Sequence, residues 1–152
     1  MRYAMNDDSL IKVVIADEMV IYRQSLETIL SERDKFLVLN SCGHIDELKH
    51  LITDEDDLPD VALISLFMAE RDSLKRAKRL RDAYPTIKII LLVALDNGKF
   101  SMKYLRRSFV DAILIRSLYA PEDVLALVRV INLGYSCFPS NDFVSKYLPD
   151  IK

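Results

Sequence analysis

Polar and charged side chains stand at the ends of short apolar runs in this chain. Asp17 and Glu18 follow the run 12–16, Ser65 lies at the end of a second run, and Arg116 follows a third. Neighbouring carboxylates are ligands that Mg²⁺ accepts, a hydroxyl can carry a phosphoryl group, and a guanidinium pairs with carboxylates or phosphates. These groups therefore indicate either a phosphate-handling site or a charge-paired relic of one.

The elements that must bring these groups together alternate regularly along the chain. Strands are expected at 12–16, 36–39, 61–66, 87–93 and 112–115, and helices at 20–33, 45–53, 72–84, 100–109 and 121–133. Strands alternating with helices of this length predict a parallel sheet covered on both faces. We therefore expect a flavodoxin-like (βα)5 doubly wound α/β sheet of five strands, whose chemistry sits at the carboxyl edge of the strands.

The bulk composition indicates a globular domain and excludes several other classes. The chain has 152 residues, of which 51% are hydrophobic and 29% charged, and its net charge is -2. This charge gives no global attraction to nucleic acid, and the apolar runs are too short to span a bilayer. Without a signal-peptide pattern we expect a cytoplasmic protein. Cys42 and Cys137 lack metal-ligand spacing and are expected to be buried thiols rather than a disulfide.

Three segments resemble the receiver domains of two-component response regulators. The segment 12–18 resembles the first receiver strand with its acidic pair, and 59–68 resembles the acceptor strand of the NarL/FixJ/LuxR class. The segment 133–140 resembles the stretch after the last receiver helix in the BvgA/EvgA branch of that class. The resemblance covers about 11–139 and implies a CheY-like receiver fold.

The resemblance also implies that most of the phosphorylation site is missing. The acidic pair is retained as Asp17 and Glu18, but the accepting aspartate is replaced by Ser65. The switch hydroxyl falls on Val93 and the lysine that ends the fifth strand falls on Arg116. We expect Arg116 to pair with one of the two acids. No cofactor is expected, apart from weak or absent Mg²⁺ binding at the acidic pair.

Two interpretations of Ser65 remain open. A serine hydroxyl is a poor nucleophile without an adjacent base, and neither His44 nor His50 lies near Ser65 in the sequence. We expect Ser65 to be a small polar residue at a degenerate acceptor position. Its phosphorylation by a protein kinase is the alternative.

The first and last helices carry more apolar residues than one buried face requires. Receivers of the resembling class often form dimers through these helices or through the fourth strand-helix region, so we expect a homodimer. The candidate interface residues are Leu26, Ile29, Val124, Val128 and Ile131. The alternative is that these side chains only pack in the core.

The expected domain plan follows the resemblance. Residues 1–10 form an N-terminal extension, 11–134 the receiver domain, and 135–152 a C-terminal extension or the start of a linker to an output domain absent from this sequence. We favour the regulatory and dimerisation half of a NarL/LuxR-type transcription regulator that works without aspartyl phosphorylation. Besides itself, its partner would be a sensor kinase or another regulatory protein, with DNA contacted only through the output domain.

Two other functions are weighed against this one. The alternative function is a stand-alone adaptor that binds another protein and has no DNA target. An enzyme is not expected, because no glycine-rich phosphate loop follows any strand and no nucleophile–base pair is evident.

Overall fold

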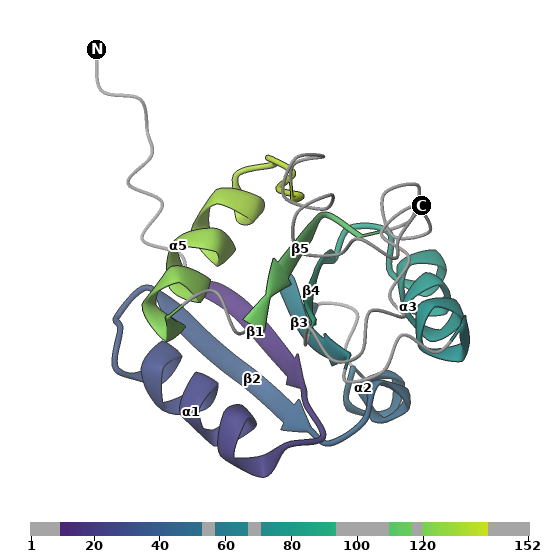
Figure 1. Ribbon diagram of the computed structural model, residues 1–152, viewed down its shortest axis with the longest axis horizontal. Coiled ribbons are helices and arrows are strands. Elements are labelled where there is room, and N and C mark those ends of the chain that lie inside the picture. The colour runs from purple at the N-terminus through teal and green to yellow at the C-terminus, as the bar shows by residue number, and fades with distance from the viewer. Residues whose placement is uncertain (1–9, 53–56, 67–70, 94–109, 117–119, 140–152) are drawn as a thin grey trace.

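The chain forms a five-stranded parallel sheet between two layers of helices (Figure 1). The computed structural model describes residues 10–52, 57–66, 71–93, 110–116 and 120–139. The strands are β1 (Ile11–Ala16), β2 (Phe36–Cys42), β3 (Val61–Leu66), β4 (Lys88–Val93) and β5 (Ala112–Ile115), in the spatial order β2-β1-β3-β4-β5. The predicted flavodoxin-like doubly wound sheet is confirmed.

The helices cover the two faces of the sheet in pairs (Figure 1). On one face α1 (Val20–Ser31) contacts α5 (Pro121–Asn132), and on the other α2 (Ile45–Leu51) contacts α3 (Arg71–Ala83). The predicted helix 100–109 lies outside the described residues. None of the described helices combines the length and the apolar character needed to cross a membrane.

Local sequence signals fix both ends of α5. The Asp123 carboxylate accepts a hydrogen bond from the backbone N–H of Ala120 at 2.9 Å, and Pro121 takes the first helical position, where its missing N–H costs nothing. At the other end Gly134 has φ +104°, a left-handed conformation that glycine adopts without strain. The helix therefore starts and stops where the sequence predicted, to within a residue.

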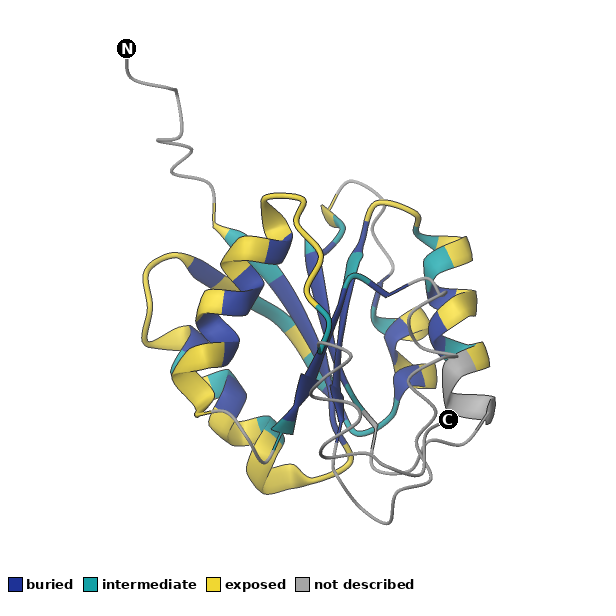
Figure 2. Ribbon diagram, turned by 45° about the horizontal axis from the view of Figure 1, so that its top comes forward, coloured by how far each residue is buried: buried dark blue, intermediate teal, exposed yellow. Residues whose placement is uncertain are grey.

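Successive side chains of the central strands enter two separate apolar clusters. In β1, Val13 and Ile15 pack beneath α1 and α5, whereas Val14 and Ala16 pack beneath α2 and α3. This alternation follows from the two-residue period of a strand. Because helices cover both faces, the strands are buried on both sides (Figure 2), which explains why they read as continuous apolar runs.

β2 is longer than the predicted strand 36–39. Its register with β1 shifts by one residue at Leu39, which is a β-bulge. Beyond the bulge, the Ser41 hydroxyl donates to the Glu27 carboxylate of α1, and Cys42 joins the cluster beneath α2 and α3. β2 lies at the edge of the sheet, where polar residues are tolerated.

The segment after α5 is attached to the sheet. The Cys137 N–H donates to the Asp111 carbonyl, and the Ile113 N–H donates to the Cys137 carbonyl, both at 3.0 Å. Phe138 packs against the cluster beneath α2 and α3. The folded unit therefore continues past residue 134, where the receiver domain was predicted to end. Both cysteines are free, but only Cys42 is buried; the expectation that Cys137 is buried is wrong, because it lies on the outer side of this segment.

The predicted dimer interface residues lie in the core. Leu26, Val124, Val128 and Ile131 are at most 6% exposed, and the half-buried Ile29 packs against the same cluster beneath α1 and α5. The structure corrects this prediction, because side chains that fill the core of one chain are not available to a second copy. The alternative of core packing applies to these five residues.

Two valines on α5 provide a matched test of this placement. We expect Val128→Ala to lower the free energy of unfolding by about 2–3 kcal/mol, because it removes two buried methyl groups and leaves a cavity. Val130, which is 42% exposed, is the control, and Val130→Ala is expected to change stability by less than about 0.5 kcal/mol. Urea unfolding followed by circular dichroism measures both. Equal losses in the two variants would contradict the assignment of Val128 to the core.

Candidate functional site

Neighbouring strand ends bring Asp17 and Ser65 together. Ala16 is paired with Ile64 across β1 and β3, so the next residue of each strand emerges at the same point of the carboxyl edge. The two-residue period places both side chains on the α1 and α5 side of the sheet. Arg116 directly follows β5, and its long side chain reaches back to the same point.

The three side chains form a closed hydrogen-bonded triangle. The Ser65 hydroxyl donates to Asp17 Oδ2 at 2.8 Å, and Arg116 Nη2 donates to the same oxygen at 2.7 Å. Arg116 Nη2 also donates to Ser65 Oγ. Since the hydroxyl proton points to Asp17, the lone pairs of Ser65 are left to accept from the guanidinium. The expected ion pair of Arg116 is thus made with Asp17.

This ion pair is removed from water. The Asp17 side chain is 0% exposed and that of Arg116 is 9% exposed. The second carboxylate oxygen, Asp17 Oδ1, accepts from the Met19 N–H at 2.9 Å, so both oxygens of the acid are hydrogen-bonded. A buried charge is costly unless it is paired in this way. The arrangement of side chains at the ends of β1 and β5 therefore requires both Asp17 and Arg116.

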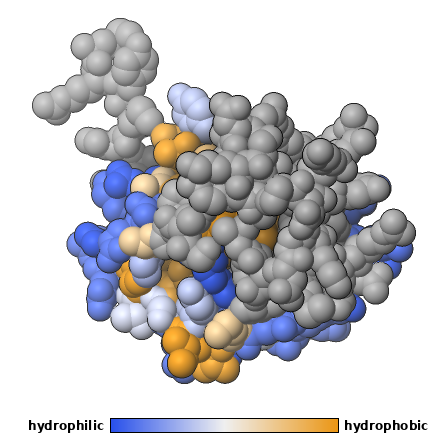
Figure 3. Space-filling view, in the orientation of Figure 1, coloured by the Kyte–Doolittle hydropathy of each residue, from blue (hydrophilic) through white to orange (hydrophobic). Residues whose placement is uncertain are grey.

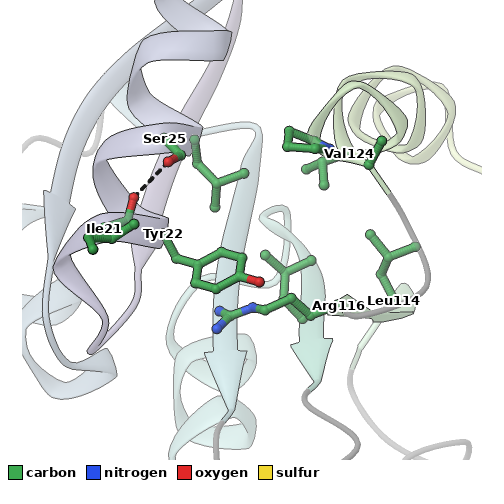
Figure 4. A pocket seen from close by; sticks show the side chains of 10 residues that line it. Ile21, Tyr22, Ser25, Leu114, Arg116 and Val124 are labelled. Carbon is green, nitrogen blue, oxygen red and sulfur yellow. Dashed lines mark hydrogen bonds between the residues drawn. The ribbon is translucent and has the colours of Figure 1, made fainter.

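Tyr22 covers the other side of the guanidinium. Its ring centroid lies 4.0 Å from Arg116 Cζ, a cation–π contact, and Figure 4 shows the ring reaching from α1 across the arginine. Arg23 of the same helix donates from Nη1 to the Asp17 carbonyl at 3.1 Å. Neither contact was expected from the sequence, because both depend on how α1 follows β1 in space.

The remaining predicted site residues do not join the triangle. Glu18 is exposed, so the acidic pair is divided between one buried and one exposed carboxylate. Val93 is 2% exposed and belongs to the apolar cluster beneath α2 and α3, on the opposite side of the sheet. Within the described ranges, no three His, Cys, Asp or Glu side chains gather in a metal-binding arrangement.

The thiol of Cys42 lies near this edge but is held neutral. Burial raises the pKa of Cys42, and the backbone of His44 offsets this only in part. The thiol also donates to the His44 carbonyl at 3.3 Å, a contact that the neutral form makes. Since the thiolate is the reactive form of cysteine, a raised pKa makes Cys42 a poor nucleophile at neutral pH. Cys42 is therefore a core residue, as the sequence predicted for it.

The importance of the ion pair can be measured with two Asp→Asn variants. Asp17→Asn leaves the Arg116 guanidinium without its carboxylate, and we expect it to lower the free energy of unfolding by about 3–5 kcal/mol. Asp57→Asn is the control, because Asp57 is 50% exposed and pairs with Lys12 at the surface; it should cost less than about 1 kcal/mol. Chemical unfolding measures the free energy of unfolding of both variants. Similar losses would show that the buried ion pair contributes no more to stability than the surface pair.

The chain has relatives among bacterial regulators. It is 25% identical over 134 residues to the uncharacterized transcriptional regulatory protein YxjL of Bacillus subtilis, across 88% of this chain and 59% of YxjL. The chain thus spans a little more than half the length of this relative. No family model matches it.

Solved structures show the same fold. The isolated REC domain of RcsB from Salmonella enterica serovar Typhimurium, in the apo form, matches with a TM-score of 0.73 at 19% identity, covering 91% of this chain and 98% of that domain. The receiver domain of the response regulator NarL from Mycobacterium tuberculosis matches with a TM-score of 0.68 at 21% identity, covering 83% and 98%. The chain therefore has the fold of response-regulator receiver domains, and its sequence is similar to that of a bacterial transcriptional regulatory protein.

Proposed function

We propose that this receiver domain works without aspartyl phosphorylation, as the regulatory and dimerisation half of a NarL/LuxR-type transcription regulator. The observation that carries the proposal is the position of Arg116, whose Nη2 lies 2.7 Å from the buried Asp17 carboxylate and also contacts Ser65. The Arg116 guanidinium therefore links Ser65, at the acceptor position, to the retained acid Asp17. Signals would reach such a domain through protein contacts.

The fixed cation argues against a magnesium site. Mg²⁺ prefers six oxygen ligands in an octahedral shell and usually keeps several waters. Here the Asp17 carboxylate is hydrogen-bonded at both oxygens, Ser65 offers a neutral oxygen, and Glu18 is exposed. A metal ion at Asp17 would also meet the positive charge of Arg116 at close range. This donor set does not fit Mg²⁺ while the triangle is intact.

The same contacts argue against a reactive Ser65. Asp17 is close enough to act as a base for the hydroxyl, a pairing that the sequence did not reveal. However, proton transfer to Asp17 would neutralise the carboxylate that holds Arg116 inside the protein. The hydroxyl therefore serves the ion pair as a hydrogen-bonding partner. Its modification by a kinase would have to break the triangle first.

The dimer in this proposal uses exposed side chains of α1 and α5 in place of the core residues first considered. Val20 and Ile21 on α1 are 51% and 76% exposed, and Leu133 after α5 is 59% exposed. Figure 3 shows apolar side chains gathered over the start of α1. RcsB, a structural relative, has been solved as dimers bound to DNA. By analogy, DNA binding would belong to an output domain, and a sensor kinase or another regulator would be the second protein partner.

A stand-alone adaptor is the second candidate function. It would use the same fixed edge and the same exposed apolar side chains to bind another regulator, without a DNA target. The coding sequence downstream of Lys152 separates the two candidates, since a helix-turn-helix there would exclude the adaptor.

The absence of phosphoryl transfer can be tested by mass. After treatment with acetyl phosphate and Mg²⁺, we expect the intact mass of the protein to be unchanged. The triple variant Ser65→Asp, Val93→Thr, Arg116→Lys restores the residue types that the resemblance implies, and it is expected to gain one phosphoryl group. A stoichiometric adduct on the native chain would overturn the proposal.

Dimerisation can be tested by light scattering. We expect a dimer whose mass is the same with and without Mg²⁺. Leu133→Glu should raise the dimer dissociation constant at least about tenfold, because it places a charge in an apolar contact. Ala83→Glu adds the same charge to an exposed position at the end of α3, on the opposite layer, and should leave the dimer intact. A monomeric native chain would exclude this part of the proposal.

A further inference from the structure

A pocket opens between α1 and α5, directly beside the triangle. It has a volume of about 340 Å³, within the range of about 300–1,000 Å³ that is typical of ligand sites. Its lining comes from α1, β4, β5 and α5, from Arg116 after β5 and from Ala120 before α5, so it is a concave site rather than a flat apolar face. The described lining residues are Ile21, Tyr22, Ser25, Leu26, Leu92, Leu114, Arg116, Ala120, Pro121 and Val124.

The walls of this pocket are apolar and its polar groups are few. Leu92 and Leu114 of the sheet contribute to the lining. Figure 4 shows α1 on one side of the pocket and α5 on the other. The Ser25 hydroxyl already donates to the Ile21 carbonyl at 2.7 Å, so it adds little polarity. An apolar lining with a small number of placed polar groups is the usual composition of a small-molecule site.

The charge of the pocket selects the kind of ligand. Of the described residues that line it, only Arg116 carries a charge, and no acidic side chain is among them. The guanidinium lies beneath the Tyr22 ring, at one end of the apolar space (Figure 4). A ligand with one anionic end and an apolar body matches this arrangement.

We infer that the pocket binds a small aromatic or branched aliphatic carboxylate, with the carboxylate against Arg116 and the apolar body between Leu26, Leu114 and Val124. Arginine accommodates carboxylates through its several planar N–H donors. A bound ligand would touch the same guanidinium that holds Asp17 and Ser65. Its occupancy would therefore be sensed at the strand ends. Binding here requires neither a dimer nor an unreactive Ser65.

The experiment uses 3-phenylpropionate as the probe and two-dimensional amide NMR of the ¹⁵N-labelled chain as the readout. We expect saturable shifts at Tyr22, Leu114 and Val124, and a smaller shift at Ser65, with a dissociation constant of about 0.1–1 mM. The neutral isostere 3-phenylpropanamide should bind at least about tenfold more weakly, because it lacks the charge. Equal affinity for the two probes, or shifts spread over the surface, would overturn the inference.

Two variants of α1 show whether the probe enters this pocket. Ser25→Phe places a ring in the space between α1 and α5 and should abolish the carboxylate-dependent shifts. Thr28→Phe puts the same ring at an exposed position of the same helix outside the pocket lining, and should leave them unchanged. Well-dispersed spectra of both variants establish that they are folded. Unaltered binding to Ser25→Phe would place the site elsewhere and contradict the inference.

Discussion

The carboxyl edge of the sheet depends on one buried charge. The Asp17 side chain is 0% exposed and is stabilised by Arg116, the Ser65 hydroxyl and the Met19 N–H. An isolated carboxylate in this position would be strongly unfavourable, so the buried Asp17 side chain depends on these hydrogen-bonding partners. A buried Asp17 carboxylate needs a group that neutralises it. Arg116 is that group.

The geometry of a parallel sheet makes this pairing possible. Register places Asp17 and Ser65 side by side, and the end of β5 lies two strands away from β3. Arginine spans that distance and keeps a delocalised planar charge, which stacks against Tyr22 at 4.0 Å while donating to both side chains at the strand ends. Lysine offers a compact, strongly hydrated charge that suits neither the stacking nor the double donation. The exchange of lysine for arginine therefore changes what this position can do.

The sequence predicted the fold because burial on both faces leaves continuous apolar runs; the strand 61–66 has the observed bounds. The sequence predicted too short a strand for β2, because polar Asn40 and Ser41 are typical of a loop. In the structure the strand continues past the β-bulge, and Ser41 contacts Glu27. The sequence predicted the cluster of Asp17, Ser65 and Arg116, because all three lie at the ends of strands that share an edge. It misjudged α5, because a helix set between the sheet and a second helix has a wide buried face, and periodicity cannot distinguish such a face from an interface. Tyr22 was missed because no sequence pattern links a helix residue to a strand end that follows 94 positions later.

A conformational switch needs two states of similar free energy. If separating Arg116 from Asp17 costs about 3–5 kcal/mol, the separated state is populated below about one per cent, since each 1.4 kcal/mol is a factor of ten. Such an edge stays in one arrangement unless something binds the other state more tightly. Under the proposed function, Ser65 takes no phosphoryl group and provides no such bias. A ligand or a protein that contacts Arg116 or its cover Tyr22 does, because it competes for the guanidinium directly. Under the proposed function, control of this domain therefore lies at the surfaces of α1 and α5 that surround the strand ends.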